Sequence, residues 1–182
     1  MAKIPPSHLA GQLSASLSFS DKVPAGDNVP RAVCNSCGFI HYVNPKIVVG
    51  SVVTWQGKFL MCRRAIEPRK GFWTLPAGFM EEGETPEEGA AREAREEACT
   101  EIKIRDLLAV YTVRHISQVQ LMYRAELTSA DFDVGEESQE VSLFDWEDIP
   151  WDALAFPSVA WALTQFRQVE NDDRITPFVN PD

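Results

Sequence analysis

The sequence predicts an α/β sandwich, in which helices cover the faces of a mixed β-sheet. Strand-like and helix-like segments alternate irregularly along the chain, which is typical of such a sheet. The 182 residues, 45% hydrophobic and 24% charged, suffice for one compact domain and an appendage. We expect an N-terminal extension with a short ribbon-like segment over residues 1–45, a main domain over 46–170 and a C-terminal tail over 171–182.

The first elements follow from turn residues and β-branched runs. Four prolines among serines and glycines predict loop or extended structure over residues 1–30, and Cys34-Asn-Ser-Cys37-Gly38 predicts a knuckle-like turn. The largely apolar residues 46–55 predict a buried strand. After a turn at Gln56-Gly57, residues 58–63 predict the return strand of a hairpin.

A helix follows whose start can be predicted residue by residue. Thr85 is expected at the N-cap, Pro86 at the first helical position and Glu88 at the third, where its side chain completes a capping box. We expect this helix to end near Ala98.

The last third of the chain predicts three strands, at about residues 107–114, 118–127 and 141–146, and a final helix that begins at Pro157. One face of that helix carries apolar residues at helical spacing: Val159, Leu163, Phe166 and Val169.

The candidate chemistry lies on the first helix, where Glu93, Glu96 and Glu97 share one face at i, i+3 and i+4. Like charges at this spacing repel each other by roughly 0.2–0.5 kcal/mol per pair. A solvated acidic face is the ordinary explanation for such a triad. The alternative is Mg²⁺, which binds carboxylates together with phosphate oxygens.

Three neighbouring features favour the cation. Arg92 lies beside the triad, and Glu84 precedes the helix where it can pair with that arginine. The loop Pro76-Ala77-Gly78 can present a backbone carbonyl to a metal ion.

Six residues of this segment match the Nudix box, in which Gly, five residues, Glu, seven residues and Arg-Glu-x-x-Glu-Glu follow in order: Gly78, Glu84, Arg92, Glu93, Glu96 and Glu97. The chain thus resembles Nudix hydrolases, which implies a Nudix-type α/β/α sandwich and cleavage of a diphosphate bridge with Mg²⁺ or Mn²⁺. Cys99 and Thr100 depart from the box, which usually ends with Gly and an aliphatic residue. The glycine usually helps the chain to leave the helix, so its absence affects the local turn and not the metal ligands.

The resemblance also implies roles. Metal ligation and catalysis fall to Glu93, Glu96 and Glu97, with the carbonyl of Ala77 as a further ligand. A structural role falls to Gly78, Glu84 and Arg92, the last two as a pair.

Family members often add a glutamate from a later loop, as a further ligand or to activate water. Glu137 and Glu140 are the candidates, and Glu140 is preferred. A solvated acidic loop is the alternative.

Motifs that flank the box, among them His115-Ile116-Ser117-Gln118 and Leu154-Ala155-Phe156-Pro157-Ser158, are similar over about residues 30–168 to those of ADP-ribose/FAD pyrophosphatases. The similarity implies that AMP is released with ribose 5-phosphate or FMN. Arg63 and Arg64 are candidates to bind phosphate, and Trp73 is a candidate to stack on a base. Solvation of the arginines and core packing of the tryptophan are the alternatives.

Cys34 and Cys37 resemble half of the zinc ribbon that precedes some Nudix domains. A structural zinc requires four ligands, usually two such pairs, and no cysteine precedes Cys34. His41 is a candidate third ligand or an ordinary strand-edge residue. We expect a degenerate ribbon, in which structural Zn²⁺ is doubtful.

The formal charge of −10 argues against nucleic-acid and membrane-surface partners. It is compatible with the small nucleotide substrate that the resemblance implies, provided cations mask the carboxylates locally. Four cysteines without a disulfide pattern indicate a reducing, cytoplasmic setting. The resemblance also implies that the protein can form a homodimer, as family members often do.

Three other functions stay open. NADH pyrophosphatases resemble the chain in ribbon and box, but their Ser-Gln-Pro-Trp-Pro-Phe-Pro element is replaced after Ser117-Gln118 by Val-Gln-Leu. An enzyme for oxidised nucleoside triphosphates is the second. A catalytically idle Nudix-fold binding module is the third, and the intact box glutamates argue against it.

Overall fold

The computed structural model describes residues 18–173 and 175–181, in two compact units divided between Asn44 and Pro45. The extension expected over residues 1–17 lies outside the described residues. In the described part of the chain, no helix is long and apolar enough to cross a membrane.

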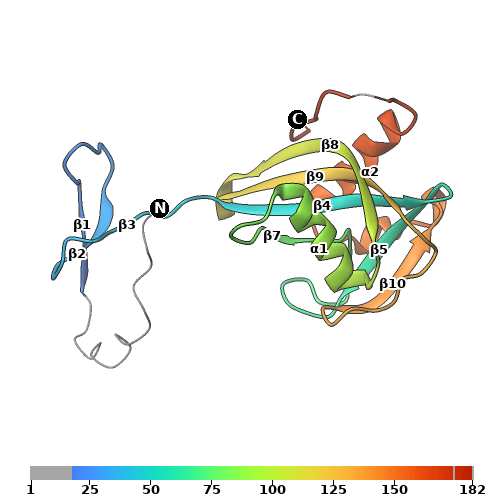
Figure 1. Ribbon diagram of the computed structural model, residues 1–182, viewed down its shortest axis with the longest axis horizontal. Helices are drawn as coiled ribbons and strands as arrows, with labels where there is room; N and C mark the ends of the chain where they lie inside the picture. Colours follow the sequence, from blue (N-terminus) through green and yellow to red (C-terminus); the bar gives the residue numbers. More distant parts are fainter. Residues whose placement is uncertain (1–17, 174, 182) are drawn as a thin grey trace. The chain divides into compact units, whose positions relative to one another are not determined.

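The first unit contains a three-stranded antiparallel sheet, in the order β1 (Phe19–Lys22), β2 (Arg31–Cys34) and β3 (Ile40–His41) (Figure 1). Within the loop or extended structure predicted for residues 1–30, β1 is a paired strand. Its short polar sequence has no strand pattern, and pairing with β2 makes it a strand. Asn35, in the turn after β2, accepts hydrogen bonds from the side chains of Ser20 and Lys22 at 2.7 and 3.0 Å.

The second unit is built on a seven-stranded mixed sheet whose main path runs β10-β5-β4-β9-β8, with β6 paired to β5 and β7 to β4 (Figure 1). β4 and β9 are parallel, and the other pairs are antiparallel. The strands are β4 (Lys46–Trp55), β5 (Lys58–Arg64), β6 (Trp73–Thr74), β7 (Ala77–Phe79), β8 (Ile102–Val113), β9 (Gln118–Leu127) and β10 (Ser138–Phe144).

The helices of the second unit are α1 (Pro86–Ala98) and α2 (Pro157–Val169), with short 3-10 turns η1 (Arg114–Ile116), η2 (Trp146–Asp148) and η3 (Trp151–Ala153). Both helix starts agree with the sequence prediction. β8 begins five residues before the predicted start.

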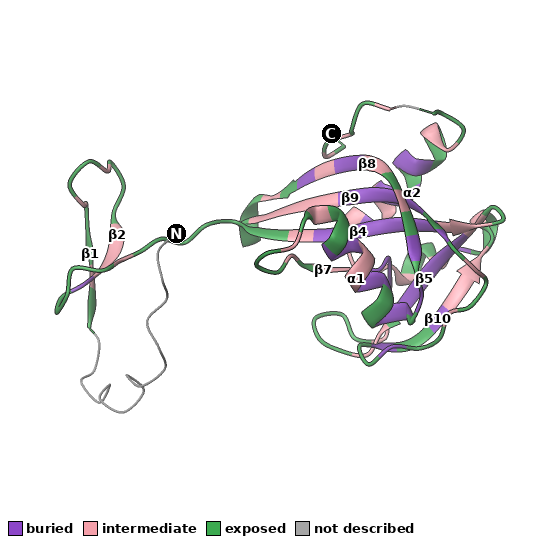
Figure 2. Ribbon diagram, viewed as in Figure 1, coloured by how far each residue is buried: buried purple, intermediate pink, exposed green. Residues whose placement is uncertain are grey.

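The two helices cover opposite faces of the sheet, as the α/β/α prediction requires. Successive residues of a strand point to opposite faces. Val52 of β4 packs in the cluster that contains Leu163 of α2, whereas Val53 packs with Ala94 of α1. Figure 2 shows the buried residues along the central strands and the inner sides of both helices. Burial of each large apolar side chain contributes roughly 1.5–3 kcal/mol.

The C-terminal segment extends the sheet edge beyond β8. The Phe178 N–H donates to the Leu108 carbonyl at 2.8 Å, and the Val110 N–H donates to the Phe178 carbonyl at 2.9 Å. Gln165 of α2 donates to the Val179 carbonyl at 3.0 Å. The segment therefore covers the edge strand and is tied to α2.

Candidate active site

The capping box fixes the start of the acidic helix. The Thr85 hydroxyl accepts from the Glu88 N–H at 3.2 Å, and the Glu88 carboxylate accepts from the Thr85 N–H at 2.8 Å. Such caps contribute about 1 kcal/mol. The fixed start sets which glutamates of α1 face inwards.

Arg92 lies at the centre of an acidic network. Its guanidinium forms a double hydrogen bond with Glu84 at 3.0 and 3.1 Å and donates to the Phe79 carbonyl at 2.9 Å. Nη1 also donates to Glu93 at 2.6 Å and to Glu96 at 2.9 Å. Arg92 therefore orients three carboxylates, two of which belong to the three box glutamates that follow it.

Glu97 is the most deeply buried of the α1 carboxylates, at 4% exposure. Burial, and after it the charge of Glu93, raises the pKa of Glu97 to about 8, although the Ala77 N–H and the charge of Arg64 act in the opposite direction. Burial also raises the pKa of Glu93, against the effect of Arg92. Desolvation therefore outweighs the hydrogen bonds and cations at both residues.

Two glycines allow the carboxylates to approach the backbone. A Cβ on Gly78 would stand 2.4 Å from both Glu93 carboxylate oxygens, and one on Gly89 would stand 2.6 Å from Glu84 Oε1. Gly78 lies on β7, which pairs with β4 at Val49. The box glycine therefore holds the strand against the acidic helix.

The loop before β10 closes over the C-terminal end of α1. The Gly135 N–H and the Ser138 hydroxyl donate to the Glu97 carbonyl at 3.2 and 2.7 Å, and the Asp133 N–H donates to the Ala98 carbonyl at 3.0 Å. These bonds satisfy carbonyls that a helix end leaves free.

This loop places Glu137, and not Glu140, beside the acidic helix. Glu137 lines the same pocket as the three α1 glutamates. Glu140 lies outside that lining and faces Arg63 at 3.6 Å. Glu137, and not Glu140, therefore lines this pocket, because the register of β10 shifts between Ser138 and Glu140 and pairs Glu140 with Arg63.

The pocket at the acidic face of α1 has a volume of about 650 Å³. Arg64 lines it, but the other two predicted substrate-binding residues do not. Trp73 is 9% exposed and packs edge-on against Phe144, with ring centroids 4.9 Å apart. Arg63 donates to the Gly71 carbonyl at 2.9 Å. Core packing thus accounts for Trp73.

Sequence reasoning assigned no role to several further residues that line this pocket. Its lining includes side chains from η1, β9 and the start of α2: His115, Gln118, Gln120, Phe156 and Trp161. Two of the motifs that flank the box, at residues 115–118 and 154–158, were the available signal.

The donor set fits Mg²⁺ or Mn²⁺. It consists of oxygens alone, which these hard ions prefer, and the buried Glu97 carboxylate has a single hydrogen bond among the described residues, from the Ala77 N–H at 3.3 Å. No three His, Cys, Asp or Glu side chains of the described residues already converge on one metal position. Glu96 is 56% exposed, and it can therefore rotate away from Arg92 towards an ion.

In the first unit, Cys34 is buried and Cys37 is exposed. Hydrogen bonds from the Ser36 hydroxyl and from the N–H groups of Cys37 and Ser36 lower the pKa of Cys34 to about 7. Within the described ranges, no cluster of three potential ligands includes either cysteine.

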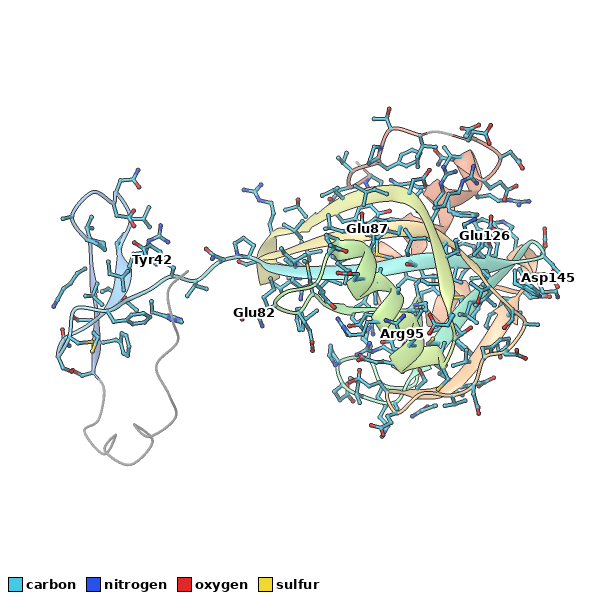
Figure 3. The ribbon with its side chains drawn as sticks, in the orientation of Figure 1. Tyr42, Glu82, Glu87, Arg95, Glu126 and Asp145 are labelled. Atoms are coloured by element: carbon cyan, nitrogen blue, oxygen red, sulfur yellow. The ribbon has the colours of Figure 1, made fainter. Side chains whose placement is uncertain are left out.

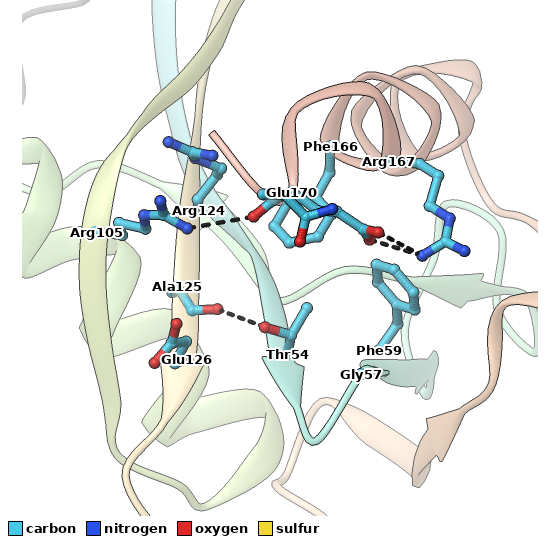
Figure 4. A pocket seen from close by; sticks show the side chains of 11 residues that line it. Thr54, Gly57, Phe59, Arg105, Arg124, Ala125, Glu126, Phe166, Arg167 and Glu170 are labelled. Atoms are coloured by element: carbon cyan, nitrogen blue, oxygen red, sulfur yellow. Dashed lines mark hydrogen bonds and ion pairs between the residues drawn. The ribbon is translucent and has the colours of Figure 1, made fainter. Parts of the chain in front are cut away.

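A second, smaller pocket of about 260 Å³ lies between the end of α2 and β4, β8 and β9 (Figure 4). Its three arginines are bound by protein groups. Arg124, which is 1% exposed, donates to Asp106 and to the Val169 carbonyl, both at 2.6 Å. Arg105 donates to the Asp172 carbonyl at 2.6 Å, and Arg167 pairs with Glu170 at 2.7 Å. The three arginines of this pocket therefore already have partners within the protein.

Many other acidic side chains are spread over the surface. Figure 3 shows examples from the loop before α1, α1, β9 and the segment after β10: Glu82, Glu87, Glu126 and Asp145. The pocket of about 650 Å³ differs from this surface, because two of the carboxylates in its lining, Glu93 and Glu97, are buried.

Both units of the chain are similar to known protein families. Residues 44–164 match the NUDIX domain, and residues 18–43 match the Nudix N-terminal zinc ribbon. A NUDIX hydrolase crystal structure from Nitrosomonas europaea is 42% identical, covers 93% of this chain and 98% of its own, and superposes with a TM-score of 0.84.

Two curated relatives carry names for specific activities. An ADP-ribose pyrophosphatase from Methanocaldococcus jannaschii is 31% identical over 63% of this chain and 69% of its own length. A human 8-oxo-dGDP phosphatase is 34% identical over 74% of this chain and 39% of its own length.

The fold and the acidic site together define a hydrolase of the pyrophosphatase class. The chain belongs to the Nudix family.

Proposed function

We propose that this enzyme is a Mg²⁺- or Mn²⁺-dependent pyrophosphohydrolase of nucleotide derivatives, with ADP-ribose or FAD as its substrate. Water adds to one phosphorus, the bridging P–O bond breaks, and AMP leaves with ribose 5-phosphate or FMN. The observation that carries the proposal is the buried carboxylate Glu97, which lines one pocket with Glu93, Glu96 and Arg64. The name of the M. jannaschii relative supports ADP-ribose.

Glu93, Glu96, Glu97 and the carbonyl of Ala77 would hold the cation. When bound, the ion neutralises the charge of the diphosphate and lowers the pKa of the attacking water. The net charge of −10 supports a small phosphorylated ligand over nucleic acid. Bound cations can neutralise the carboxylates within one pocket, but they leave the rest of the surface negative, and that surface repels an extended polyanion.

The protein groups orient the ligands and the substrate. Arg92 holds Glu93 and Glu96 in place, and Gly78 leaves room for the Glu93 carboxylate. Arg64 is suited to bind a phosphate oxygen, since it lines the pocket beside Glu97. Glu137 is suited to accept the proton of the attacking water, because it is an exposed carboxylate in the lining of the same pocket.

The test is a product assay on the full chain with ADP-ribose, FAD, NADH and 8-oxo-dGDP, each with Mg²⁺, Mn²⁺ or EDTA. We expect release of AMP from ADP-ribose or FAD with either metal, and no release in EDTA. Preferential turnover of 8-oxo-dGDP or NADH would contradict the assignment of the substrate.

A matched set of variants can identify which glutamate, Glu137 or Glu140, activates the water. Glu137→Gln should lower kcat by roughly 10²-fold, the lower range for loss of a general base. Glu140→Gln should leave kcat unchanged, and Glu136→Gln serves as the control at an exposed neighbouring position. A loss confined to Glu140→Gln would restore the prediction made from sequence.

A further inference from the structure

One asparagine of the first unit connects the turn after β2 to β1 and the residue before it. The Asn35 N–H donates to the Ser18 carbonyl at 2.9 Å, and Asn35 Nδ2 donates to the Ser18 hydroxyl at 3.1 Å. Asn35 Oδ1 accepts from the Ser20 hydroxyl at 2.7 Å and from the Lys22 ammonium at 3.0 Å. A single residue therefore links the two parts of the small sheet through four hydrogen bonds.

In a zinc ribbon, a metal ion makes this kind of link, with four ligands that usually come from two cysteine pairs. The first unit has one such pair, Cys34 and Cys37, and no cluster of three potential ligands includes either of them among the residues that the structure describes. The ammonium of Lys22 also binds to the turn that contains both cysteines, and its positive charge opposes a second cation there. The donor set therefore does not fit a structural zinc ion.

The two thiols of the pair are in contact with each other. The Cys34 sulfur accepts hydrogen bonds from the N–H groups of Ser36 and Cys37 and from the Cys37 thiol. The Gly38 N–H donates to the Cys34 carbonyl at 3.0 Å and closes the turn. A tight turn brings the Cα atoms of residues i and i+3 to within about 7 Å, and a disulfide needs about 4.4–6.8 Å. The turn is therefore suited to a bond between the two sulfurs.

The cysteines differ in how far a reagent can reach them. Cys34 is 2% exposed, whereas Cys37 is exposed. An oxidant in solution can therefore react with Cys37, while Cys34 lies behind it in contact with the Cys37 sulfur. Exchange between thiols and disulfides proceeds through a mixed disulfide, which a second, adjacent thiol can resolve.

We propose that Cys34 and Cys37 form a redox-active dithiol, which low-molecular-weight disulfides oxidise to a disulfide, in a ribbon that its hydrogen bonds hold together without zinc. The Cys37 thiolate attacks one sulfur of the small disulfide, whose S–S bond breaks and releases one small thiol. The Cys34 thiolate then attacks the Cys37 sulfur and displaces the second small thiol. Two electrons pass from the cysteines to the small disulfide, and the two cysteine protons pass to the released thiols.

The test equilibrates the reduced full chain with oxidised and reduced glutathione at several ratios, and measures free thiols by alkylation and peptide mass spectrometry. The wild type should lose two thiols, at Cys34 and Cys37, with the loss of two hydrogens and no added glutathione. Dithiothreitol should reverse the loss. Cys34→Ser should stop at a glutathione adduct on Cys37, whereas Cys99→Ser, at an exposed cysteine of α1, should behave as the wild type.

A second measurement tests how the ribbon is held together. Protein purified without added metal or chelator should contain less than stoichiometric zinc by elemental analysis. Amide hydrogen exchange of β1 and β2 should be unchanged by EDTA. Asn35→Leu should lower the protection of these amides roughly tenfold or more, because the hydrogen bonds of its side chain are lost. Asn28→Leu, at another exposed asparagine of the first unit, should leave it unchanged.

Four results would overturn the proposal. The first is one zinc ion per chain that is lost when Cys34 and Cys37 are both replaced by serine. The second is a folded wild type that keeps both thiols, or stops at a glutathione adduct, in excess oxidised glutathione. The third is oxidation that joins Cys37 to a second chain. The fourth is an unchanged protection of β1 in Asn35→Leu together with a loss of protection in EDTA.

Discussion

Two arginine-centred clusters of the second unit differ in how their charges are balanced. Arg124 lies in the interior, and it binds one carboxylate, Asp106, together with main-chain carbonyls at the end of α2. Arg92 binds three carboxylates, Glu84, Glu93 and Glu96. The first cluster is neutral within itself, whereas the second keeps an excess of negative charge.

The difference separates a structural cluster from a functional one. A buried ion pair whose hydrogen bonds are all made adds rigidity and needs no ligand to balance its charge. An acidic excess that includes a buried carboxylate costs stability unless a cation binds, and such groups gather at functional sites. Changes at the two arginine clusters should therefore affect different measurements.

The largest effect is expected at the acidic cluster. Glu97→Gln should lower kcat with ADP-ribose by roughly 10²–10³-fold, the usual loss for one electrostatic contributor. The stability of the metal-free protein should rise, because a pKa raised to about 8 means that Glu97 must take up a proton on folding at pH 7, and a neutral glutamine avoids that cost. Kinetics and thermal melting measure the two effects. With Glu101→Gln as an exposed control, near-normal turnover of Glu97→Gln would show that Glu97 does not bind the metal.

The balanced cluster should show the reverse behaviour. Arg124→Met leaves Asp106 and the end of α2 without their partner, and removal of one partner from a buried pair costs roughly 3–5 kcal/mol. Because Asp106 is 30% exposed, we expect about 2–4 kcal/mol, measured by urea unfolding, with unchanged kcat in the folded fraction. Arg105→Met, at a more exposed arginine, should cost less than about 1 kcal/mol. Equal losses in both variants would contradict the structural role of Arg124.

A smaller effect is expected where the loop before β10 meets α1. A Cβ on Gly135 would stand 1.8 Å from the Glu96 carbonyl oxygen. Gly135→Ala should therefore cost about 1–3 kcal/mol, as overpacking does, and lower kcat several-fold because Glu137 moves with the loop. Glu136→Ala is the control at the next, exposed residue. Unchanged stability and kcat in Gly135→Ala would mean that the loop does not position Glu137.

The smallest effect concerns the turn that leaves α1. Cys99 takes the place of the usual box glycine in a left-handed conformation with φ of 48°, which costs an ordinary residue roughly 1–2 kcal/mol. Glycine loses more chain entropy on folding, about 0.5–1 kcal/mol. Cys99→Gly should therefore stabilise the protein by about 0.5 kcal/mol in urea unfolding, with kcat unchanged. Cys99→Ser, which keeps the Cβ, should give no gain, and a gain from serine would exclude the backbone explanation.

Residues close together in sequence were the most predictable. The triad of α1 shares a face because the helical period places it there, and Thr85 with Pro86 marks the helix start through its own backbone chemistry. β1 was predictable only as loop or extended structure, because its strand character comes from pairing with β2. The roles of Trp73 and Glu140 stayed open, because an aromatic or acidic residue type does not tell which side of a strand meets the pocket.

By itself, the sequence determined the two helices and the five long strands of the main sheet, the acidic face of α1 and the pairing partners Glu84 and Arg92, since all depend on local spacing. The tertiary structure alone decided that Glu137 lines the pocket, that Trp73 belongs to the core and that two glutamines of β9 share a cavity with two aromatic rings. Those relations depend on register and on which strands become neighbours. The packing of the whole chain sets both, and no short stretch of sequence records them.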